Sequence, residues 1–546
     1  MTAPAARLAP LSSLPASVDA VIVGAGFAGL YMLLRLRRMN MSAVVIEAGD
    51  DVGGTWYWNR YPGARCDIES LEYQYGFDDD LAREWKWTER YAAQPEILRY
   101  IQFVADRYEL RDGIQFETRV TSATFDDAAK RWTVTTDRGE TVSARFCIMA
   151  TGCLSSARVP EFKGLDSFTG EWYHTGAWPH EGVDFTGKRV GVIGTGSSAI
   201  QSIPHIARQA AHLTVFQRTA NFSIPAHNGP VDPEREKEMS AQYSVFRAKA
   251  RASHGGVVPR MVPVRSALEA TPEERQQEYQ QRWEYGGFAI GSTYNDLAIN
   301  KESNDTAAEF VRSKIREIVK DPETAELLCP RDYPFATKRL CIDIDYFETY
   351  NRPNVSLVDV KSTPIDEITP AGVRVGEKEY EFDAIVFATG FDAITGALSN
   401  IDIRGKGGFP LKEKWEHGPR TYLGLQVAGF PNLFTITGPG SPSVLSNMIV
   451  SIEQHVDWIS DCLGYLREHE LQTIEATVEA EDAWVDHVNH VANFTLYPLA
   501  NSWYIGANVP GKPRVFMPYI GGVGVYGARC TEVAEAGYEG FTLGVA

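Results

Sequence analysis

The stretch that decides the fold is Asp19-Ala-Val-Ile-Val-Gly-Ala-Gly-Phe-Ala-Gly29, close to the start of the chain. Its short β-branched run, which ends in glycine, is typical of a buried parallel strand. Residues 30–39 are rich in Leu, Met and Arg and favour a helix, and Ala43-Val-Val-Ile-Glu47 favours a second strand. Strand, glycine turn, helix and strand in this order form a βαβ module. The sequence therefore predicts a Rossmann-like nucleotide-binding unit here.

Three glycines of this module follow the pattern G-x-G-x-x-G, a weak signal alone that the strand–turn–helix context strengthens. Gly24 allows the tight turn, Gly26 lets the backbone approach a pyrophosphate, and Gly29 lets the helix pack on the strand. Glu47 ends the second strand, where an acid accepts hydrogen bonds from ribose hydroxyls. We expect the helix N-terminus to bind the phosphates of a first dinucleotide.

The same order recurs further along the chain. Residues 188–193 favour a strand, Gly194-Thr-Gly-Ser-Ser-Ala199 the turn, residues 200–210 a helix and residues 213–218 the next strand. No acid ends this strand, and Arg218 stands there instead. An acid would repel the 2′-phosphate of NADPH, whereas a guanidinium can pair with it. The second nucleotide is therefore predicted to be NADPH.

Two nucleotide modules in one chain favour electron transfer from a nicotinamide to a flavin, which makes the first module the natural FAD site. Ala150-Thr-Gly152 and Ala388-Thr-Gly-Phe-Asp392 each follow an apolar strand and are expected to cross between the two domains. The predicted fold class is α/β, with two Rossmann-like dinucleotide-binding domains, for FAD and NADP, and a helical insertion. The predicted divisions are a flexible tail at 1–18, the FAD domain at 19–153 and 388–546 (with the substrate pocket in the second part), the NADP domain at 154–224 and 333–387, and the insertion at 225–332.

Composition and charge narrow the classes of partner. The formal net charge of −18 argues against nucleic acid and anionic membranes, because both attract basic surfaces. No apolar run reaches the roughly 18–20 residues of a membrane span, and the first 18 residues lack a signal-peptide pattern. Seven scattered cysteines favour reduced thiols in the cytoplasm, and no Cys/His cluster has metal-ligand spacing. We expect a cytoplasmic protein that binds small molecules and no metal.

Two longer motifs resemble a known family. Phe168-Thr-Gly-Glu-Trp-Tyr-His-Thr-Gly-Ala-Trp-Pro179 matches the signature F-x-G-x-x-x-H-T-x-x-W-P of type I Baeyer–Villiger monooxygenases. Gly53-Gly-Thr-Trp-Tyr-Trp-Asn-Arg-Tyr-Pro-Gly-Ala-Arg-Cys-Asp67 matches a second signature of that family. The resemblance extends from about residue 18 to the C-terminus. Within the family, Gly438-Pro-Gly-Ser-Pro-Ser-Val-Leu-Ser-Asn-Met448 is most similar to the branch of phenylacetone and steroid monooxygenases.

The resemblance implies roles for five residues in particular. Arg339 falls on the catalytic arginine of the family, and Asp67 falls on the aspartate near the flavin that positions it. Lys338 falls on the position that contacts the 2′-phosphate of NADP, and Trp503 on a mobile tryptophan that contacts NADP. His174 falls on the signature histidine, which couples the two domains and donates no proton to substrate.

The resemblance also implies the rest of the candidate site. Together with the module residues, the expected FAD contacts are Gly24, Gly26, Gly29, Glu47, Thr55, Trp56, Asp67, Tyr73, Val120 and Met448. The expected NADP contacts are Arg65, Gly194, Thr195, Gly196, Ser197, Ser198, Gln201, Arg218, Thr219, Lys338, Arg339 and Trp503. Trp178 joins His174 in the coupling signature, and Ser443, Val444 and Leu445 are expected to line the substrate pocket.

In this family NADPH-reduced FAD reacts with dioxygen, and the resulting C4a-peroxyflavin inserts one oxygen atom into a ketone to give an ester or lactone. The resemblance implies this activity here, with sulfoxidation as a side activity. The small to medium side chains at 443–445 imply bulky or aromatic ketones. A fixed guanidinium at Arg339 suits the chemistry because it stays charged, and one preorganised donor is often worth roughly 3–4 kcal/mol in the transition state.

Several alternatives stay open. A flavin N-hydroxylase or S-oxygenase is disfavoured by the Trp-Pro ending of the first signature and by Arg339. A non-catalytic nucleotide-sensing protein is disfavoured by the intact Asp67 and Lys338. A disulfide reductase would need a redox pair near the first glycine turn, and an oxidase that releases hydrogen peroxide remains as a partial activity. We expect a monomer, as relatives often are.

Overall fold

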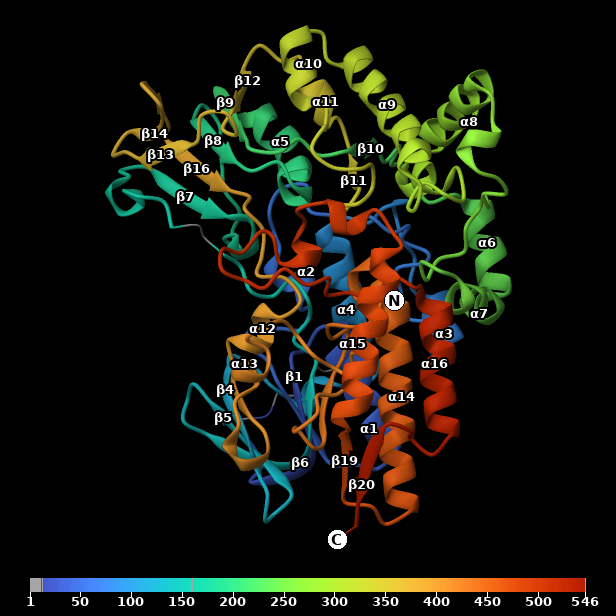
Figure 1. Cartoon of the computed structure of the whole chain (residues 1–546). Helices are drawn as coiled ribbons and strands as arrows, with labels where there is room; N and C mark the ends of the chain where they lie inside the picture. The colour runs from blue at the N-terminus through green and yellow to red at the C-terminus, as the bar shows by residue number, and fades with distance from the viewer. Residues whose placement is uncertain (1–10, 12, 159–160, 546) are drawn as a thin grey trace.

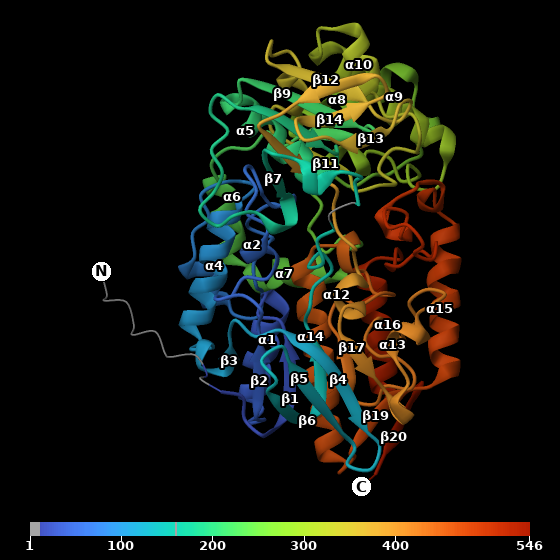
Figure 2. The same ribbon diagram turned by 90° about the vertical axis from the view of Figure 1, so that its left-hand side faces the viewer.

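The structure is a computed structural model that describes residues 11, 13–158 and 161–545 of the chain. Figure 1 shows two α/β bodies, one around β1–β6 and the other around β7–β9, with a group of helices (α6–α10) running along both. Figure 2, turned by 90°, shows the same two bodies one above the other. The predicted α/β class with two Rossmann-like units is confirmed.

The first body is built on an eight-stranded sheet of order β17-β4-β5-β6-β1-β2-β3, in which β18 also pairs with β6. β1 (Ser17–Val23) runs parallel to both β2 (Ala43–Ile46) and β6 (Thr141–Met149), as the βαβ pattern predicts. Residues 20–22 of β1 are fully buried, because this central strand has packed layers on both faces. The other strands are β3 (Ile114–Gln115), β4 (Val120–Asp126), β5 (Arg131–Thr136), β17 (Asp402–Arg404) and β18 (Leu433–Thr435).

Helices from both ends of the chain cover one face of this sheet. α1 (Phe27–Arg38) and α14 (Met448–Glu468) pack in one apolar cluster with Ala20 and Ile22. Val21 and Val23 point to the opposite face of the sheet, as the period-2 alternation of a strand requires. The remaining elements of this body are α2 (Thr55–Trp58), α3 (Asp79–Glu84), α4 (Gln94–Arg107), α12 (Gly396–Ser399), α13 (Leu411–Lys414), α15 (Val478–Asn493), α16 (Val523–Glu535), β19 (Thr473–Ala476) and β20 (Phe541–Gly544).

The second body holds a five-stranded parallel sheet of order β12-β9-β8-β16-β7. β8 (Arg189–Ile193) leads through α5 (Ser197–Gln209) to β9 (His212–Gln217), which reproduces the predicted second module. The partner strands are β7 (Glu171–His174), β12 (Val355–Asp359) and β16 (Ala384–Phe387). An antiparallel sheet that the sequence did not predict follows β12 and comprises β13 (Ile365–Ile368), β14 (Gly372–Val375) and β15 (Lys378–Glu381).

The predicted insertion is helical and touches both bodies (Figure 1). α7 packs beside α16 of the first body, whereas α9 packs with α11 of the second. The charged run over 233–252 is two helices, because the backbone leaves helical geometry at Gln242 (φ −140°, ψ 41°). The helices of the insertion are α6 (Pro233–Ala241), α7 (Tyr243–Ala252), α8 (Pro272–Tyr285), α9 (Lys301–Ile318) and α10 (Pro322–Leu328). Next to it in sequence, β10 (Ser223–Pro225) pairs with β11 (Cys341–Asp343), and α11 (Tyr346–Thr349) follows in the second body.

Ser17 and Val18, the last two residues of the predicted flexible tail at 1–18, lie in a strand. Residues 1–10 and 12 lie outside the described residues, so the prediction stays open for them. Ser17 and Val18 already belong to β1, where they pair with Ser143 and Ala144. The backbone amide of Leu11 donates to the carbonyl of Ile114 at 3.2 Å. Backbone pairing therefore begins before the apolar run that marked the strand in the sequence.

Candidate active site

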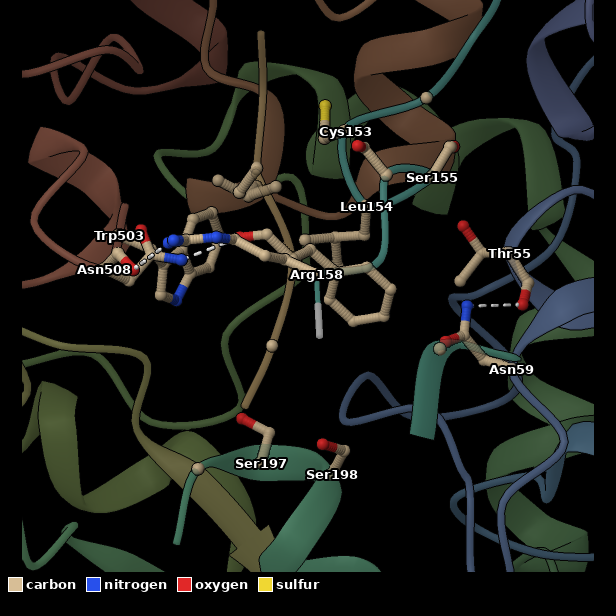
Figure 3. Close-up of a pocket in the computed structure, with 18 of the residues that line it drawn as sticks. Thr55, Asn59, Cys153, Leu154, Ser155, Arg158, Ser197, Ser198, Trp503 and Asn508 are labelled. Carbon is tan, nitrogen blue, oxygen red and sulfur yellow. Dashed lines mark hydrogen bonds between the residues drawn. The ribbon is translucent and has the colours of Figure 1, made fainter. Parts of the chain in front are cut away.

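A large cavity, of about 1620 Å³, lies where the two bodies meet. Residues of both glycine turns line it, together with side chains that come from the C-terminal third of the chain. Figure 3 shows Ser197 and Ser198, at the start of α5, facing the same space as Thr55 and Asn59 of the first body. The two predicted nucleotide sites therefore open into one chamber.

The first glycine turn has the shape that a pyrophosphate site needs. Gly24 has φ +104°, and a Cβ there would lie 2.7 Å from the carbonyl oxygen of Ala150. A Cβ on Gly29 would lie 1.8 Å from the carbonyl oxygen of Gly24, so α1 can approach the strand only through glycine. Gly26 caps α1 without any side-chain hydrogen bond, which leaves the helix amides available to an anion. The turn therefore fits the diphosphate of FAD.

Glu47 occupies the position predicted for the ribose acid. One carboxylate oxygen accepts a hydrogen bond from the amide of Ala25 and the other from the amide of Gly49, both at 2.7 Å. Burial raises the pKa of Glu47, and these two hydrogen bonds oppose that shift. Each oxygen keeps a second lone pair, and the side chain lines the cavity, so Glu47 can still accept from ribose hydroxyls.

Gly29→Ala is expected to yield protein without bound flavin and with a lowered unfolding temperature, since the new methyl group would overlap a backbone oxygen. Gly527→Ala is the matched control: Gly527 also lies inside a helix, α16, but a Cβ there meets no atom within 4 Å. The ratio of flavin to protein absorbance and a thermal melt measure both effects. Full flavin content in Gly29→Ala would contradict the close-packing requirement.

The second glycine turn repeats this geometry. Gly194 has φ +117°, and a Cβ there would lie 2.4 Å from the carbonyl oxygen of Ala388. Gly196 caps α5 without a side-chain bond, and a Cβ there would meet only open space. The hydroxyl of Thr195 donates to the carbonyl of Thr219 at 2.7 Å and so ties the turn to the end of β9. This turn fits a second dinucleotide.

Two cations stand beside the second turn. Arg218 and Lys338 both line the cavity, and the Lys338 ammonium lies 4.6 Å from the ring centre of Tyr333. Burial, and then the positive charge of Arg218, lower the pKa of Lys338 to about 8. A dianionic phosphate placed between the two cations would relieve this repulsion. The pair therefore fits the 2′-phosphate of NADPH.

The KM for NADPH is expected to rise, by up to about ten-fold, between about pH 7 and pH 9, because Lys338 is charged below its pKa and neutral above it. The phosphate itself stays dianionic over this range. The KM for NADH should change little over the same range. Lys338→Arg is the control, because a guanidinium does not deprotonate and should flatten the NADPH profile. Parallel profiles for NADPH and NADH would count against a phosphate contact at Lys338.

Arg339 and Asp67 form a bidentate ion pair on the cavity wall. Nε of Arg339 donates to one Asp67 oxygen at 2.9 Å and Nη2 donates to the other at 2.7 Å. Nη1 donates to the carbonyl of Val444 at 2.7 Å, and the guanidinium stacks 5.0 Å from the ring centre of Phe288. The two side chains are 24% and 25% exposed, so a ligand in the cavity can reach them. The guanidinium is thus fixed on three sides.

Arg339 stays charged in this setting. Burial alone would lower its pKa, but the carboxylate of Asp67 outweighs that effect and raises the pKa above the ordinary arginine value. Arg339 precedes β11 and Asp67 precedes α3, and 272 positions separate them in sequence. The structure therefore brings together two residues that the resemblance alone had associated.

Most other predicted site residues line the same cavity. Trp56 donates through its indole N–H to the hydroxyl of Tyr73 at 3.2 Å. Arg65 pairs with Glu89 at 2.6 Å. Gln201 donates to the carbonyl of Arg65 at 3.0 Å and so joins α5 to the second signature. The predicted residues that line the cavity are Gly24, Gly26, Glu47, Thr55, Trp56, Arg65, Asp67, Tyr73, Val120, Gly194, Thr195, Gly196, Ser197, Ser198, Gln201, Arg218, Thr219, Lys338, Arg339, Val444, Met448 and Trp503.

Three residues predicted for the nucleotide and substrate sites, Gly29, Ser443 and Leu445, do not line the cavity. Gly29 is in the body of α1, as close packing requires. Ser443 is fully buried, and Leu445 packs in an apolar cluster that also includes Trp503, so of the three expected pocket residues only Val444 lines this cavity. Ser443 has φ +42°. This left-handed backbone turns its side chain into the protein, a feature that residue size did not reveal.

The signature residues His174 and Trp178 lie at and just after the end of β7 in the second body. Nδ1 of His174 accepts from the amide of Gly176 at 3.0 Å, so Nε2 carries the proton and donates to the hydroxyl of Thr389 at 3.2 Å. Burial lowers the pKa of His174, which favours this neutral form. Trp178 is buried against Phe185. Thr389 belongs to the second crossing segment, so the contact fits the predicted coupling role.

Some polar residues of the cavity were not predicted. Figure 3 shows Arg158 beside Trp503 and Asn508, and its guanidinium donates to the carbonyl of Asn508 at 3.3 Å. Asn508 in turn donates to the carbonyl of Phe391 at 2.7 Å. Cys153 also lines the cavity. The signal that could have identified Cys153 and Arg158 was their place in the sequence. Cys153 directly follows the first crossing segment at 150–152, and Arg158 comes shortly after it.

Among the residues that the structure describes, no group of His, Cys, Asp and Glu could hold a metal ion. The seven cysteines, all within the described part of the chain, are buried and form no disulfide. A search of the described helices finds none with both the length and the apolar character that crossing a membrane requires. Two dinucleotide turns that share one chamber with a fixed arginine define a two-nucleotide oxidoreductase.

Comparisons with known proteins narrow this class. A family model described as pyridine nucleotide-disulphide oxidoreductase matches residues 21–250. The chain is 44% identical over 529 residues to a Baeyer–Villiger monooxygenase of Pseudooceanicola batsensis (96% of each chain), and 43% identical over 530 residues to a phenazine N-monooxygenase of Lysobacter antibioticus (96% of this chain and 97% of that one). A solved structure of oxidized steroid monooxygenase bound to NADP is 52% identical, with a TM-score of 0.92 over 97% of this chain and 100% of that one. The chain belongs to the Baeyer–Villiger monooxygenase family.

These comparisons confirm the resemblance predicted from the two signatures, including the steroid monooxygenase branch. The matching family model takes its name from disulfide oxidoreductases, yet Cys147 and Cys153 are not bonded to each other or to another cysteine. The matched residues extend over both nucleotide modules, from within β1 to beyond the end of β9. The match therefore reflects the shared nucleotide-binding fold.

Proposed function

We propose that the chain is an FAD- and NADPH-dependent Baeyer–Villiger monooxygenase that inserts one atom of dioxygen into a bulky or aromatic ketone to give an ester or lactone. When bound, FAD supplies the activation of dioxygen and NADPH supplies the electrons. The observation that carries the proposal is the guanidinium of Arg339, fixed by Asp67 and by the Val444 carbonyl on the wall of a chamber shared by two nucleotide turns. Monomeric state and cytoplasmic location stay predictions.

The chain's own groups would hold the two nucleotides. The N-termini of α1 and α5 present uncapped amides to the two diphosphates, and Glu47 accepts from ribose hydroxyls of FAD. Arg218 and Lys338 bind the 2′-phosphate that distinguishes NADPH from NADH. Trp503 and Arg158, which lie together on one side of the chamber in Figure 3, contact the second nucleotide.

Arg339 would act on the ketone. Its guanidinium remains protonated beside Asp67, so it can stabilise the negative charge that develops on the ketone's carbonyl oxygen. Because three contacts already fix the group, little reorganisation is needed when that charge appears. Apolar side chains of the wall, such as Leu154, Val444 and Met448, limit the access of water to the reacting atoms.

The test is NADPH consumption by the purified yellow protein, with and without phenylacetone, cyclohexanone and a steroid ketone. Ester and hydrogen peroxide are quantified in the same samples. Ester formed in step with NADPH consumed supports the proposal and gives the size class of the substrate. Turnover of small cyclic ketones alone would contradict the bulky or aromatic preference.

Peroxide as the sole product across the ketone panel would count against ketone oxygenation. Amines and sulfides are then the next substrates to test, because the N-monooxygenase relative has the same fold and a similar degree of identity. N-oxide formed in preference to any ester would overturn the proposal.

A further inference from the structure

Cys153 lies on the segment that follows β6 and lines the chamber. Figure 3 shows it on the same stretch as Leu154 and Ser155. Its Sγ lies 3.0 Å from the hydroxyl oxygen of Ser443 and 3.3 Å from the carbonyl oxygen of Thr437. These contacts join residues about 290 positions apart, so the thiol connects the crossing segment to the loop at 437–445.

The direction of the two hydrogen bonds follows from the groups present. The Thr437 carbonyl can only accept, so the single S–H proton of Cys153 serves the contacts with Thr437, whose hydroxyl oxygen also lies 3.5 Å from the sulfur. The sulfur then accepts the hydroxyl proton of Ser443. Burial raises the pKa of the Cys153 thiol, which keeps that proton in place. The thiol therefore acts as donor to one end of the loop and acceptor at the other.

Both loop residues that it holds have an uncommon backbone. Thr437 has φ +57° and Ser443 has φ +42°, in the left-handed region that non-glycine residues rarely adopt. Such conformations persist only where surrounding contacts enforce them. For Thr437 a second contact exists, because its amide donates to Nδ1 of His455 at 2.9 Å. For Ser443 the side-chain contact is the one with Cys153.

The residue after Ser443 is the one that contacts the arginine. The carbonyl of Val444 accepts from Nη1 of Arg339 at 2.7 Å. Asp67 pairs with Nε and Nη2, so the Val444 carbonyl is the hydrogen-bond partner of the third nitrogen, Nη1, while the Tyr504 hydroxyl also interacts with the guanidinium. A change in the backbone at Ser443 would move this carbonyl.

We propose that Cys153 is a positioning residue for Arg339, acting through Ser443 and the Val444 carbonyl to set the orientation of the guanidinium in the chamber. This inference rests on the proposed function, in which Arg339 stabilises charge on the ketone. Among the described residues, the hydrogen bonds of the Cys153 side chain go to Thr437 and Ser443 and none goes to Arg339. When these hydrogen bonds are lost, the Val444 carbonyl moves away from Nη1, Arg339 keeps its pair with Asp67 but loses the contact that holds Nη1, and more of the activated oxygen is released as peroxide.

Three variants test this. Cys153→Val keeps the approximate shape of the side chain and removes both hydrogen bonds, Cys153→Ser keeps a donor and an acceptor, and Ser443→Ala removes the same bond from the other side. Cys147→Val is the matched control, since Cys147 is also a buried cysteine, near the end of β6, but packs in an apolar cluster. If Cys153→Val does not fold, the same measurements on Ser443→Ala test the proposal.

Two readouts apply. In crystal structures of the holoenzymes, Nη1 of Arg339 is expected beyond hydrogen-bond distance of the Val444 carbonyl in Cys153→Val and within it in Cys153→Ser. In turnover, ester formed per NADPH is expected to fall about five-fold in Cys153→Val, the effect of one lost hydrogen bond, while Cys153→Ser stays close to the parent enzyme. Cys153→Val combined with Ser443→Ala should fall no further than Cys153→Val alone.

An intact Nη1–Val444 contact in Cys153→Val would overturn the proposal, as would a Cys153→Ser enzyme no better coupled than Cys153→Val. Equal loss of coupling in Cys147→Val would show that a buried cysteine matters only for packing, and would also overturn it. If the parent enzyme forms no ester from any ketone, the proposed function fails, yet the crystallographic distances still decide whether Cys153 positions Arg339.

Discussion

Replacing Arg339 by alanine is expected to lower ketone oxygenation by about 10²–10³-fold, the usual cost of removing one preorganised donor from a site where negative charge develops. The protein should still contain flavin, because Arg339 belongs to neither glycine turn. NADPH should still be consumed, with hydrogen peroxide as the main product. Ester, peroxide and NADPH measured together test this result.

Arg339→Lys separates charge from geometry. An ammonium keeps the positive charge, but it cannot pair with both Asp67 oxygens and the Val444 carbonyl in the planar arrangement of a guanidinium. We therefore expect a rate of ester formation between the rates of the parent enzyme and of the alanine variant. Arg374→Ala is the control, because Arg374 of β14, the middle strand of the small antiparallel sheet, pairs with Glu367 at 2.6 Å and does not line the cavity. Ester formed by Arg339→Ala at the parental rate would rule out the proposed role.

The nucleotide modules could be predicted from the sequence because their signals are local. Strand, turn and helix at 19–39 are consecutive, and the steric limits on Gly24 and Gly29 arise from contacts within or directly beside the module. The second module was predicted for the same reason. Such patterns depend on local backbone geometry and little on distant segments of the chain.

What escaped prediction depends on contacts between distant segments. β17 and β18 are three-residue strands that join the first sheet from positions 402–404 and 433–435, and so short a run carries no periodic pattern. The pair formed by Arg339 and Asp67 came from family resemblance, since nothing in either local sequence indicates a partner 272 positions away. The Ser443 side chain turns inward to Cys153, which lies 290 positions away in sequence.

Arg218→Ala is expected to lower kcat/KM for NADPH by about ten- to hundred-fold, the range for a lost hydrogen bond between charged groups. Arg218 directly follows β9 beside the second glycine turn, at the place where NAD-specific proteins carry an acid. The loss should appear mainly in KM, because the 2′-phosphate is remote from the reacting atoms and its contact is the same in the ground and transition states.

NADH is the internal control for this variant, because it differs from NADPH only by the phosphate. The kcat/KM for NADH should stay within about two-fold of the parent value. The variant should therefore lose its preference for NADPH and keep its activity with NADH. Lys338 would remain as the sole cation of the pair, and removing the charge of Arg218 also removes one cause of its lowered pKa. The rise of the KM for NADPH with pH should therefore occur at a higher pH in Arg218→Ala than in the parent enzyme. An equal loss with both nucleotides would mean that Arg218 supports the fold of the second body and does not read the phosphate.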